Sequence, residues 1–140
     1  MHERRLEDLR IGQTAERRRV VSEADIDAFA AVSGDTNPVH LDAAYAAGTR
    51  FGGRIAHGML AASWLSALLG TDLPGPGAIY VSQTLRFRRP VRIGDAVTAR
   101  VAIAAIDTER GRVTLEITCL VEGKSVVEGE AVVMVARRSA

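Results

Sequence analysis

The hydrophobic positions of the chain follow two different periods, and a proline- and glycine-rich break at residues 73–77 separates them. Before the break, apolar residues recur mainly at helical spacing. Beyond it they alternate with polar residues, as they do in half-buried strands. We expect strands over residues 78–88, 96–106, 113–121 and 126–135. The pattern therefore predicts about four consecutive antiparallel strands after the break.

The first of these strands has a simple expected division between its two faces, because side chains alternate along a strand. One face is expected to carry Ile79, Val81 and Gln83. The other is expected to carry Tyr80, Ser82 and Thr84.

The N-terminal part predicts one strand and then a helix. Residues 13–21 have the mixed polarity that suits a strand at a sheet edge. Ser22 then begins Ser-Glu-Ala-Asp, which resembles a capping box with Asp25 where Glu or Gln is usual. The helix is expected to end at Gly34. Its apolar positions at helical spacing are Ile26, Phe29, Ala30 and Val32.

Two further helices are expected before the break. A turn-rich loop over residues 35–42 comes first, and Asp42 is expected to cap a short helix over residues 43–47. The second helix, over residues 56–69, is apolar around almost its whole circumference. A helix of that kind is normally buried. We therefore expect it to be the central helix of the fold.

One fold accounts for both the helical spacing before the break and the strand alternation after it. A long apolar helix can bury its circumference only inside a curved antiparallel sheet, so we expect an α+β fold with the sheet wrapped around the helix. The chain shows no linker or internal repeat, which predicts one domain over residues 1–140. A single open sheet has free edges, and pairing into a homodimer would cover one of them.

Composition narrows the class of protein. The 140 residues are 47% hydrophobic, enough for a core, and the net charge of +1 argues against a general nucleic-acid binder. The single cysteine, Cys119, excludes an internal disulfide and is expected to be a small core residue. The charged residues 1–10 do not resemble a signal peptide, and the longest apolar run, 59–69, is too short to span a bilayer. We expect a cytoplasmic protein that does not bind membranes.

The candidate chemistry lies in the loop before the central helix and at the start of that helix. Asp35 and His40 could hold a water between them and transfer its protons, although the five-residue spacing taken alone favours a plain turn with a structural histidine, by about two to one. At the start of the helix, Gly58 could offer its backbone N–H to an oxyanion, or it could merely allow close packing. His57 is expected to be structural, and Ser66 is expected to be buried on the helix.

Other kinds of site have weaker support. No Gly-x-Ser-x-Gly elbow, phosphate-binding loop or dinucleotide fingerprint is present, so neither a serine hydrolase nor a nucleotide cofactor is expected. The three histidines do not form a convincing metal set, and we expect no metal. Arg86 and Arg88 share a strand face and could meet substrate phosphates, although a solvated face is the simpler interpretation.

Two motifs together carry a family resemblance. Residues 33–42 read Ser-Gly-Asp-x-Asn-Pro-x-His-x-Asp, and residues 51–59 read Phe-Gly-x-Arg-Ile-Ala-His-Gly-Met. In order, spacing and chain length they resemble the (R)-specific enoyl-CoA hydratases, the MaoC-like dehydratase family of the hot-dog fold. The likeness extends over nearly the whole chain, including the Pro-Gly break and the strand with Gln83 and Phe87.

The resemblance implies a function and a site. Asp35 and His40 would be the catalytic pair, the N–H of Gly58 would polarise the thioester carbonyl, and Ser66 would support the site, with Asn37 nearby in the first motif. The reaction would be reversible syn hydration of trans-2-enoyl-CoA to the (R)-3-hydroxyacyl-CoA, without a cofactor. The substrate would be an acyl-CoA or acyl carrier protein thioester, and the protein a homodimer.

Two other functions fit the same fold. A hot-dog acyl-CoA thioesterase would direct water at the carbonyl carbon and would not need the pair of Asp35 and His40 in this loop. A non-catalytic acyl-thioester-binding subunit would predict a broken motif, and the motif here is intact.

Overall fold

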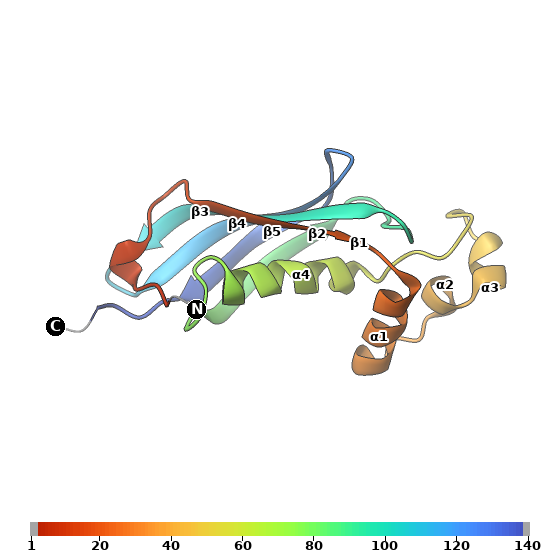
Figure 1. The fold of residues 1–140 in the computed structure, drawn as a ribbon, viewed down its shortest axis with the longest axis horizontal. Helices are drawn as coiled ribbons and strands as arrows, with labels where there is room; N and C mark the ends of the chain where they lie inside the picture. Colours follow the sequence, from red (N-terminus) through yellow and green to blue (C-terminus); the bar gives the residue numbers. More distant parts are fainter. Residues whose placement is uncertain (1–2, 139–140) are drawn as a thin grey trace.

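The structure is a computed structural model that describes residues 3–138, and it contains one five-stranded sheet with helices on one side and at one end (Figure 1). A 3₁₀ turn, Leu6–Asp8, comes first in the chain. The helices are α1 Glu23–Ser33, α2 Pro38–Leu41, α3 Ala43–Ala47 and α4 Gly58–Thr71. The strands are β1 Thr14–Val20, β2 Ile79–Phe87, β3 Ala96–Asp107, β4 Arg112–Val121 and β5 Lys124–Met134.

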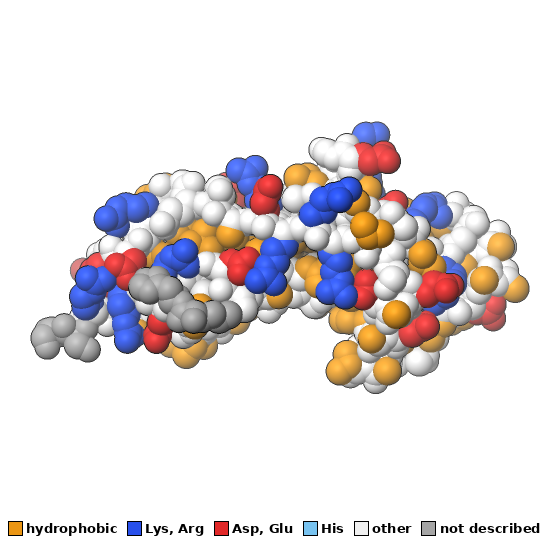
Figure 2. Space-filling model, viewed as in Figure 1, with side chains coloured by type: hydrophobic (Ala, Val, Ile, Leu, Met, Phe, Trp, Pro, Cys, Tyr) orange, Lys and Arg blue, Asp and Glu red, His pale blue; other side chains and the backbone are white. Residues whose placement is uncertain are grey.

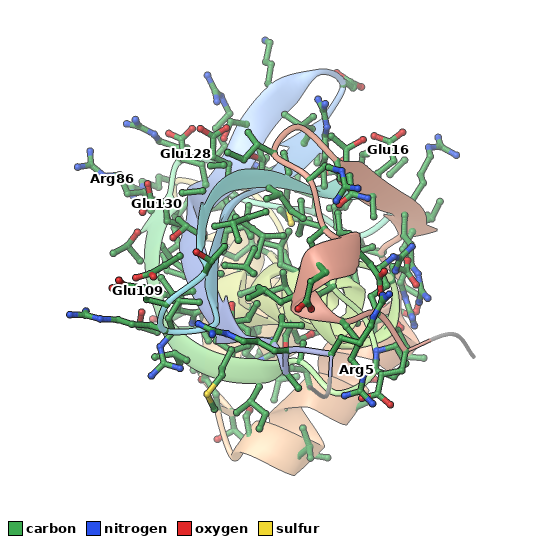
Figure 3. The ribbon with its side chains drawn as sticks, turned by 90° about the vertical axis from the view of Figure 1, so that its left-hand side faces the viewer. Arg5, Glu16, Arg86, Glu109, Glu128 and Glu130 are labelled. Atoms are coloured by element: carbon green, nitrogen blue, oxygen red, sulfur yellow. The ribbon has the colours of Figure 1, made fainter. Side chains whose placement is uncertain are left out.

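The sheet has the order β1-β3-β4-β5-β2, and every neighbouring pair is antiparallel. The expected four strands after the break and the expected edge position of the first strand are both confirmed. The sheet curls around α4, as the end-on view in Figure 3 shows. The helix packs mainly on β3 and β4, with β1 and β5 at its flanks. The predicted architecture of a curved antiparallel sheet around a central helix is therefore present.

The core lies between α4 and the concave face of the sheet. Leu65 and Leu68 of the helix are fully buried against alternate residues of β3 and β4, including Val101, Leu115 and Ile117. Cys119 is also buried, as expected, and its thiol lies 3.5 Å from the carbonyl oxygen of Ala61. Burial raises the pKa of this thiol to about 12, so it stays protonated and packs as a small apolar side chain.

The expectation that α4 is buried all round was wrong for one stripe of the helix. The sheet covers only one side of a cylinder, so positions spaced by three and four residues on the other side stay exposed. This exposed stripe of α4 consists of Met59, Ser63, Ser66, Ala67 and Gly70. Ser66, expected to be buried, is therefore exposed in the single chain. The stripe is mostly small or polar, which is why the apolar composition of the helix did not reveal it.

The expected faces of β2 were wrong because the strand contains a bulge. Its pairing with β5 shifts register between Tyr80 and Ser82, which inserts one residue and interrupts the alternation. Tyr80 and Gln83, assigned to opposite faces, therefore lie on the same side, and the Tyr80 hydroxyl donates to Gln83 Oε1 at 2.5 Å. β2 is the second edge strand, and nearly all of its residues are exposed.

The expected helix boundaries in the N-terminal half are largely confirmed. Ser22 and Asp25 form the reciprocal capping box, and Gly34 ends α1 in a left-handed conformation with φ 78°. Two details differ. Val32 is 83% exposed rather than part of the apolar face, and the loop before Asp42 contains the short helix α2.

The visible surface carries both signs of charge. Figure 2 shows arginine side chains interspersed with acidic ones rather than gathered into one basic face. Ion pairs account for part of this arrangement, for example Arg17 with Asp72 at 2.7 Å. Within residues 3–138, no helix has the length and apolar character needed to cross a membrane.

Gly129 is a position where the sheet tolerates no side chain. It pairs with Leu85 on one side and Ile117 on the other, and a Cβ added there would lie 1.8 Å from the carbonyl oxygen of Thr84. We expect Gly129→Ala to displace β2 and to lower the free energy of unfolding by about 3 kcal/mol or more. Thermal denaturation at fixed protein concentration measures the change.

Gly53→Ala is the matched control, because a Cβ at Gly53 meets no atom within 4 Å and the residue is not in a left-handed conformation. Gly53→Ala should change the midpoint temperature of thermal unfolding very little. Equal stability of both variants would contradict the tight pairing of β2 with β5.

Candidate active site

The segment between α1 and α4 lies beyond one end of the sheet, where α1, α2 and α3 gather (Figure 1). Arg54 holds this segment together. Its guanidinium donates to the carbonyl oxygen of His40 at 2.6 Å, to Glu23 at 3.1 Å and to Asp27 at 3.2 Å, and its side chain is largely buried. One arginine therefore fixes α2 against α1. Ile55, the next residue, forms a β-bridge with Arg92 that anchors the approach to α4.

Asp35 lies in the first turn after α1, and its carboxylate is exposed. Its Oδ1 accepts from the N–H of Asn37 at 3.2 Å, and its own N–H donates to Ser33 Oγ at 3.1 Å. Asn37 in turn caps α2, because its Oδ1 accepts from the N–H of Val39 at 3.2 Å. These short-range bonds fix the backbone at Asp35 while one carboxylate oxygen stays available to solvent or substrate.

His40 is in α2 and is 9% exposed. Its Nδ1 lies 2.8 Å from the carbonyl oxygen of Ile55. A carbonyl oxygen can only accept, so Nδ1 carries the proton and donates it. In the neutral ring Nε2 therefore keeps its lone pair and can act as a base.

His57 links the two motifs and is 2% exposed. Its Nε2–H donates to the carbonyl oxygen of Asp35 at 2.9 Å, and its ring stacks on that of His40 with 3.9 Å between centroids. The Phe29 ring packs against the His57 ring, with 4.9 Å between their centroids. Its Nδ1 is the one buried side-chain nitrogen or oxygen without a hydrogen-bond partner among the described residues. Leaving such an atom unpaired costs about 1–3 kcal/mol.

Gly58 is the first residue of α4, where backbone N–H groups lack partners within the helix. No atom of residues 3–138 accepts a hydrogen bond from its N–H. The Phe87 ring occupies the space beside the Cα of Gly58, because a Cβ at position 58 would lie 2.6 Å from Phe87 Cδ1. A side chain at position 58 would therefore displace the Phe87 ring, and the N–H of Gly58 lies at the positive end of the helix dipole.

A cavity of about 410 Å³ has both His40 and Gly58 in its wall. A neighbouring cavity of about 390 Å³ has Ser66, Tyr80 and Gln83 in its wall, and Met59 borders both. Burial raises the pKa of the Tyr80 hydroxyl, which stays protonated and donates to Gln83. The structure thus brings the Asp35 carboxylate within 4.8 Å of the His40 imidazole, and it places His40 and Gly58 in one cavity wall that Asp35 does not line. Ser66 lies two helical turns further along α4, in the wall of the neighbouring cavity.

The structure does not bring Arg86 to this cavity. Figure 3 shows Arg86 on the outer face of the sheet beside Glu128 and Glu130. Arg88 borders both the inner cavity and this outer group, but its Nε donates to Glu128. This hydrogen bond lowers the pKa of the Glu128 carboxyl, so the pair stays ionised at neutral pH.

A metal ion could find three ligands of two types here, one carboxylate and two imidazoles. Asp35, His40 and His57 each offer one ligand atom, and these atoms lie within 4.8 Å of one another. One nitrogen of each ring is already bonded to a carbonyl oxygen, and the rings are stacked rather than splayed. The same spacing suits a water shared by a carboxylate and an imidazole, which needs no metal.

Sequence reasoning did not find three residues of this site. Arg54 was quoted within a motif but given no role, because its acidic partners Glu23 and Asp27 lie far away in the sequence, in α1. Phe87 was noted only as part of a strand. Arg50 lies in the cavity wall, and nothing in its local sequence distinguishes it from the other arginines.

The sheet, the central helix and this site define a hot-dog domain with a histidine and a carboxylate at the start of its helix. Comparison with known proteins agrees, because the family model described as MaoC-like domain matches residues 8–125. The chain belongs to the MaoC-like family. Both the predicted family and the predicted hot-dog fold are confirmed.

Several relatives are similar over nearly the whole chain. The (R)-specific enoyl-CoA hydratase of Rhodospirillum rubrum is 55% identical over 94% of this chain and 92% of its own length. The 3-hydroxybutyryl-CoA dehydratase of Methylorubrum extorquens is 50% identical over 94% of this chain and 84% of its own. The solved R-hydratase PhaJ1 of Pseudomonas aeruginosa is 47% identical, with a TM-score of 0.91 over 96% of this chain and 86% of that one.

Proposed function

We propose that this protein is a hydro-lyase that reversibly adds water to trans-2-enoyl-CoA and forms the (R)-3-hydroxyacyl-CoA. Two relatives, 55% and 46% identical to the chain, are named (R)-specific enoyl-CoA hydratases. The observation that carries the proposal is the placement of the Asp35 carboxylate and the His40 imidazole within 4.8 Å of each other, with the N–H of Gly58, unpaired among residues 3–138, in the same cavity wall as His40. A proton-transfer pair and an oxyanion donor are what hydration of a conjugated thioester requires.

The mechanism follows from the proton positions. A water held between Asp35 and His40 gives one proton to His40 Nε2 while its oxygen bonds to C3 of the enoyl thioester. The electron pair of the C2=C3 bond moves toward the thioester oxygen, where the N–H of Gly58 stabilises the negative charge. A proton from the same pair of residues then reaches C2. The elements of one water molecule are added from one face, so the addition is syn, and the enzyme ends in its starting state.

Ser66 and Asn37 have supporting roles in this proposal. Asn37 orders the loop by capping α2 and by donating its N–H to Asp35. Ser66 faces the neighbouring cavity on the exposed stripe of α4, where a hydroxyl can contact the bound acyl group. The arginines beside the cavity are suited to a negatively charged thioester carrier.

We also propose that the active protein is a homodimer. β2 is an open edge strand with exposed apolar side chains at Ile79 and Val81, and it lies next to the exposed stripe of α4. Edge pairing with a second copy would satisfy the free backbone groups of β2 and cover both surfaces. Such a dimer would also enclose the Ser66 cavity.

Substitution of the catalytic pair tests the reaction. Asp35→Asn and His40→Gln should each lower turnover of crotonyl-CoA by about a hundredfold or more, because each removes a proton-transfer group. Loss of the conjugated enoyl absorbance measures hydration, and a thiol reagent run in parallel measures hydrolysis. Thiol release by the wild type would instead indicate a thioesterase, and no change in either signal would indicate a binding subunit.

His57 provides a separate test of how the pair is held. The Nε2–H of His57 holds the backbone at Asp35, so His57→Asn, whose amide is too short to reach that carbonyl, should lower kcat about tenfold or more with a smaller change in KM. His57→Gln places an amide N–H near the lost donor and should recover part of the rate. If both variants lose activity only in proportion to thermal stability, His57 supports the fold and does not position the pair.

The dimer is tested at the bulge of β2. Val81 is 47% exposed, and Val81→Arg would place a charge at the proposed interface. We expect this variant to be monomeric by light scattering at concentrations where the wild type is dimeric. Ile11→Arg is the control, since Ile11 is 68% exposed before β1, and its mass should match the wild type. A monomeric wild type would refute the dimer.

A further inference from the structure

The cavity that contains His40 and Gly58 has a basic rim. Besides apolar side chains, Arg50, Arg88 and Arg89 lie in its wall. No aspartate or glutamate of the described residues lines it. A cavity with apolar walls and positive charge at the rim suits an elongated ligand with an uncharged arm and an anionic end.

The three arginines differ in how far their charge is already neutralised. Arg88 is bonded to Glu128. Arg89 donates only to the neutral carbonyl oxygen of Ser125, and Arg50 forms no ion pair with any residue of 3–138. Elsewhere in the chain several arginines are paired with carboxylates, for example Arg19 with Asp25. Arg50 and Arg89 therefore keep their full charge for a ligand.

Arg50 is exposed but has one contact within the chain that orients its side chain. Its guanidinium carbon lies 4.9 Å from the centroid of the Phe51 ring, within the range of a cation–π contact. The backbone of Phe51 is held on both sides, because its N–H donates to Thr49 Oγ1 at 3.3 Å and its carbonyl oxygen accepts from the Arg92 guanidinium. A guanidinium supported in this way loses less side-chain entropy when it binds an anion.

We propose that Arg50 and Arg89 bind the phosphate end of the pantetheine arm of the substrate. This inference rests on the proposed function, because it takes the reacting thioester to lie between His40 and Gly58. With the thioester at that end of the cavity, the uncharged arm runs along the apolar wall and the phosphate reaches the two guanidinium groups. Arginine suits this contact, because its planar fork can donate two hydrogen bonds to one phosphate.

The test compares a thioester that carries phosphate with one that does not. Crotonyl-CoA carries phosphates beyond the arm, whereas crotonyl-pantetheine has the same arm and acyl group without them. We expect the double variant Arg50→Gln, Arg89→Gln to raise KM for crotonyl-CoA about tenfold or more, the scale of a lost charge-assisted contact. Its kcat should change little, and its KM for crotonyl-pantetheine should match that of the wild type.

Two further measurements strengthen the test. Because the contact is electrostatic and near the surface, added salt should raise the wild-type KM for crotonyl-CoA and have less effect on the double variant. The double variant Arg50→Lys, Arg89→Lys keeps the charge and should recover part of the affinity. Arg110→Gln, in the turn between β3 and β4 at the other end of the sheet, is the charge-matched control and should leave KM unchanged.

The outcomes separate this inference from the proposed function. If the wild type hydrates both thioesters and the glutamine variant has an unchanged KM for crotonyl-CoA, the phosphate site is overturned and the hydratase stands. An equal rise of KM for both thioesters also overturns it, because the arginines would then contact something other than phosphate. If the wild type hydrates neither thioester, the proposed function itself fails.

Discussion

The packing of α4 against the concave face of one sheet is the constraint on which the rest of the structure depends. Leu65 and Leu68 are fully buried there, and the strands must curl to reach them. A single sheet nevertheless covers only one side of a helix. The arrangement therefore leaves the stripe around Ser66 uncovered and leaves β2 as an open edge. The core, the cavity beside Ser66 and the surface available to a partner all follow from the fact that the sheet covers α4 on one side only.

The site is assembled at the end of that helix by bonds to backbone carbonyls. His40 donates to the carbonyl of Ile55, and His57 donates to the carbonyl of Asp35, so each motif holds an imidazole of the other. These bonds also decide proton positions, because a carbonyl accepts and never donates. The free Nε2 of His40, which the proposed chemistry needs as a base, is therefore a consequence of the fold.

Charge is distributed differently at the site and elsewhere. Arg54 is largely buried but compensated by two carboxylates and a carbonyl, and its role is to fix α2 against α1. Arg86 lies among glutamates on the outer face. Arg50 and Arg89, at the cavity rim, have no carboxylate partner among the described residues. The arginines thus divide into those that stabilise the fold and those that remain available to a ligand.

The sequence alone determined the features that depend on local chemistry and on periodicity. The capping box of Ser22 and Asp25, the helix end at Gly34 and the alternating strands are fixed by nearby residues, so they were predicted correctly. The pair of motifs was sufficient to identify the family. The bulge that places Tyr80 beside Gln83 was missed, because a one-residue insertion in a strand depends on the pairing with β5.

Only the tertiary structure decided which groups meet and which stay exposed. The exposure of Ser66 depends on how far the sheet curls. The closeness of Phe87 to Gly58 depends on where β2 ends. The hydrogen bond from His57 to the carbonyl oxygen of Asp35 depends on how the loop folds onto α4. The same holds for the division of arginines, since Arg50 differs from Arg86 only in what surrounds it. These properties arise from contacts between segments far apart in the chain, and no local pattern records them.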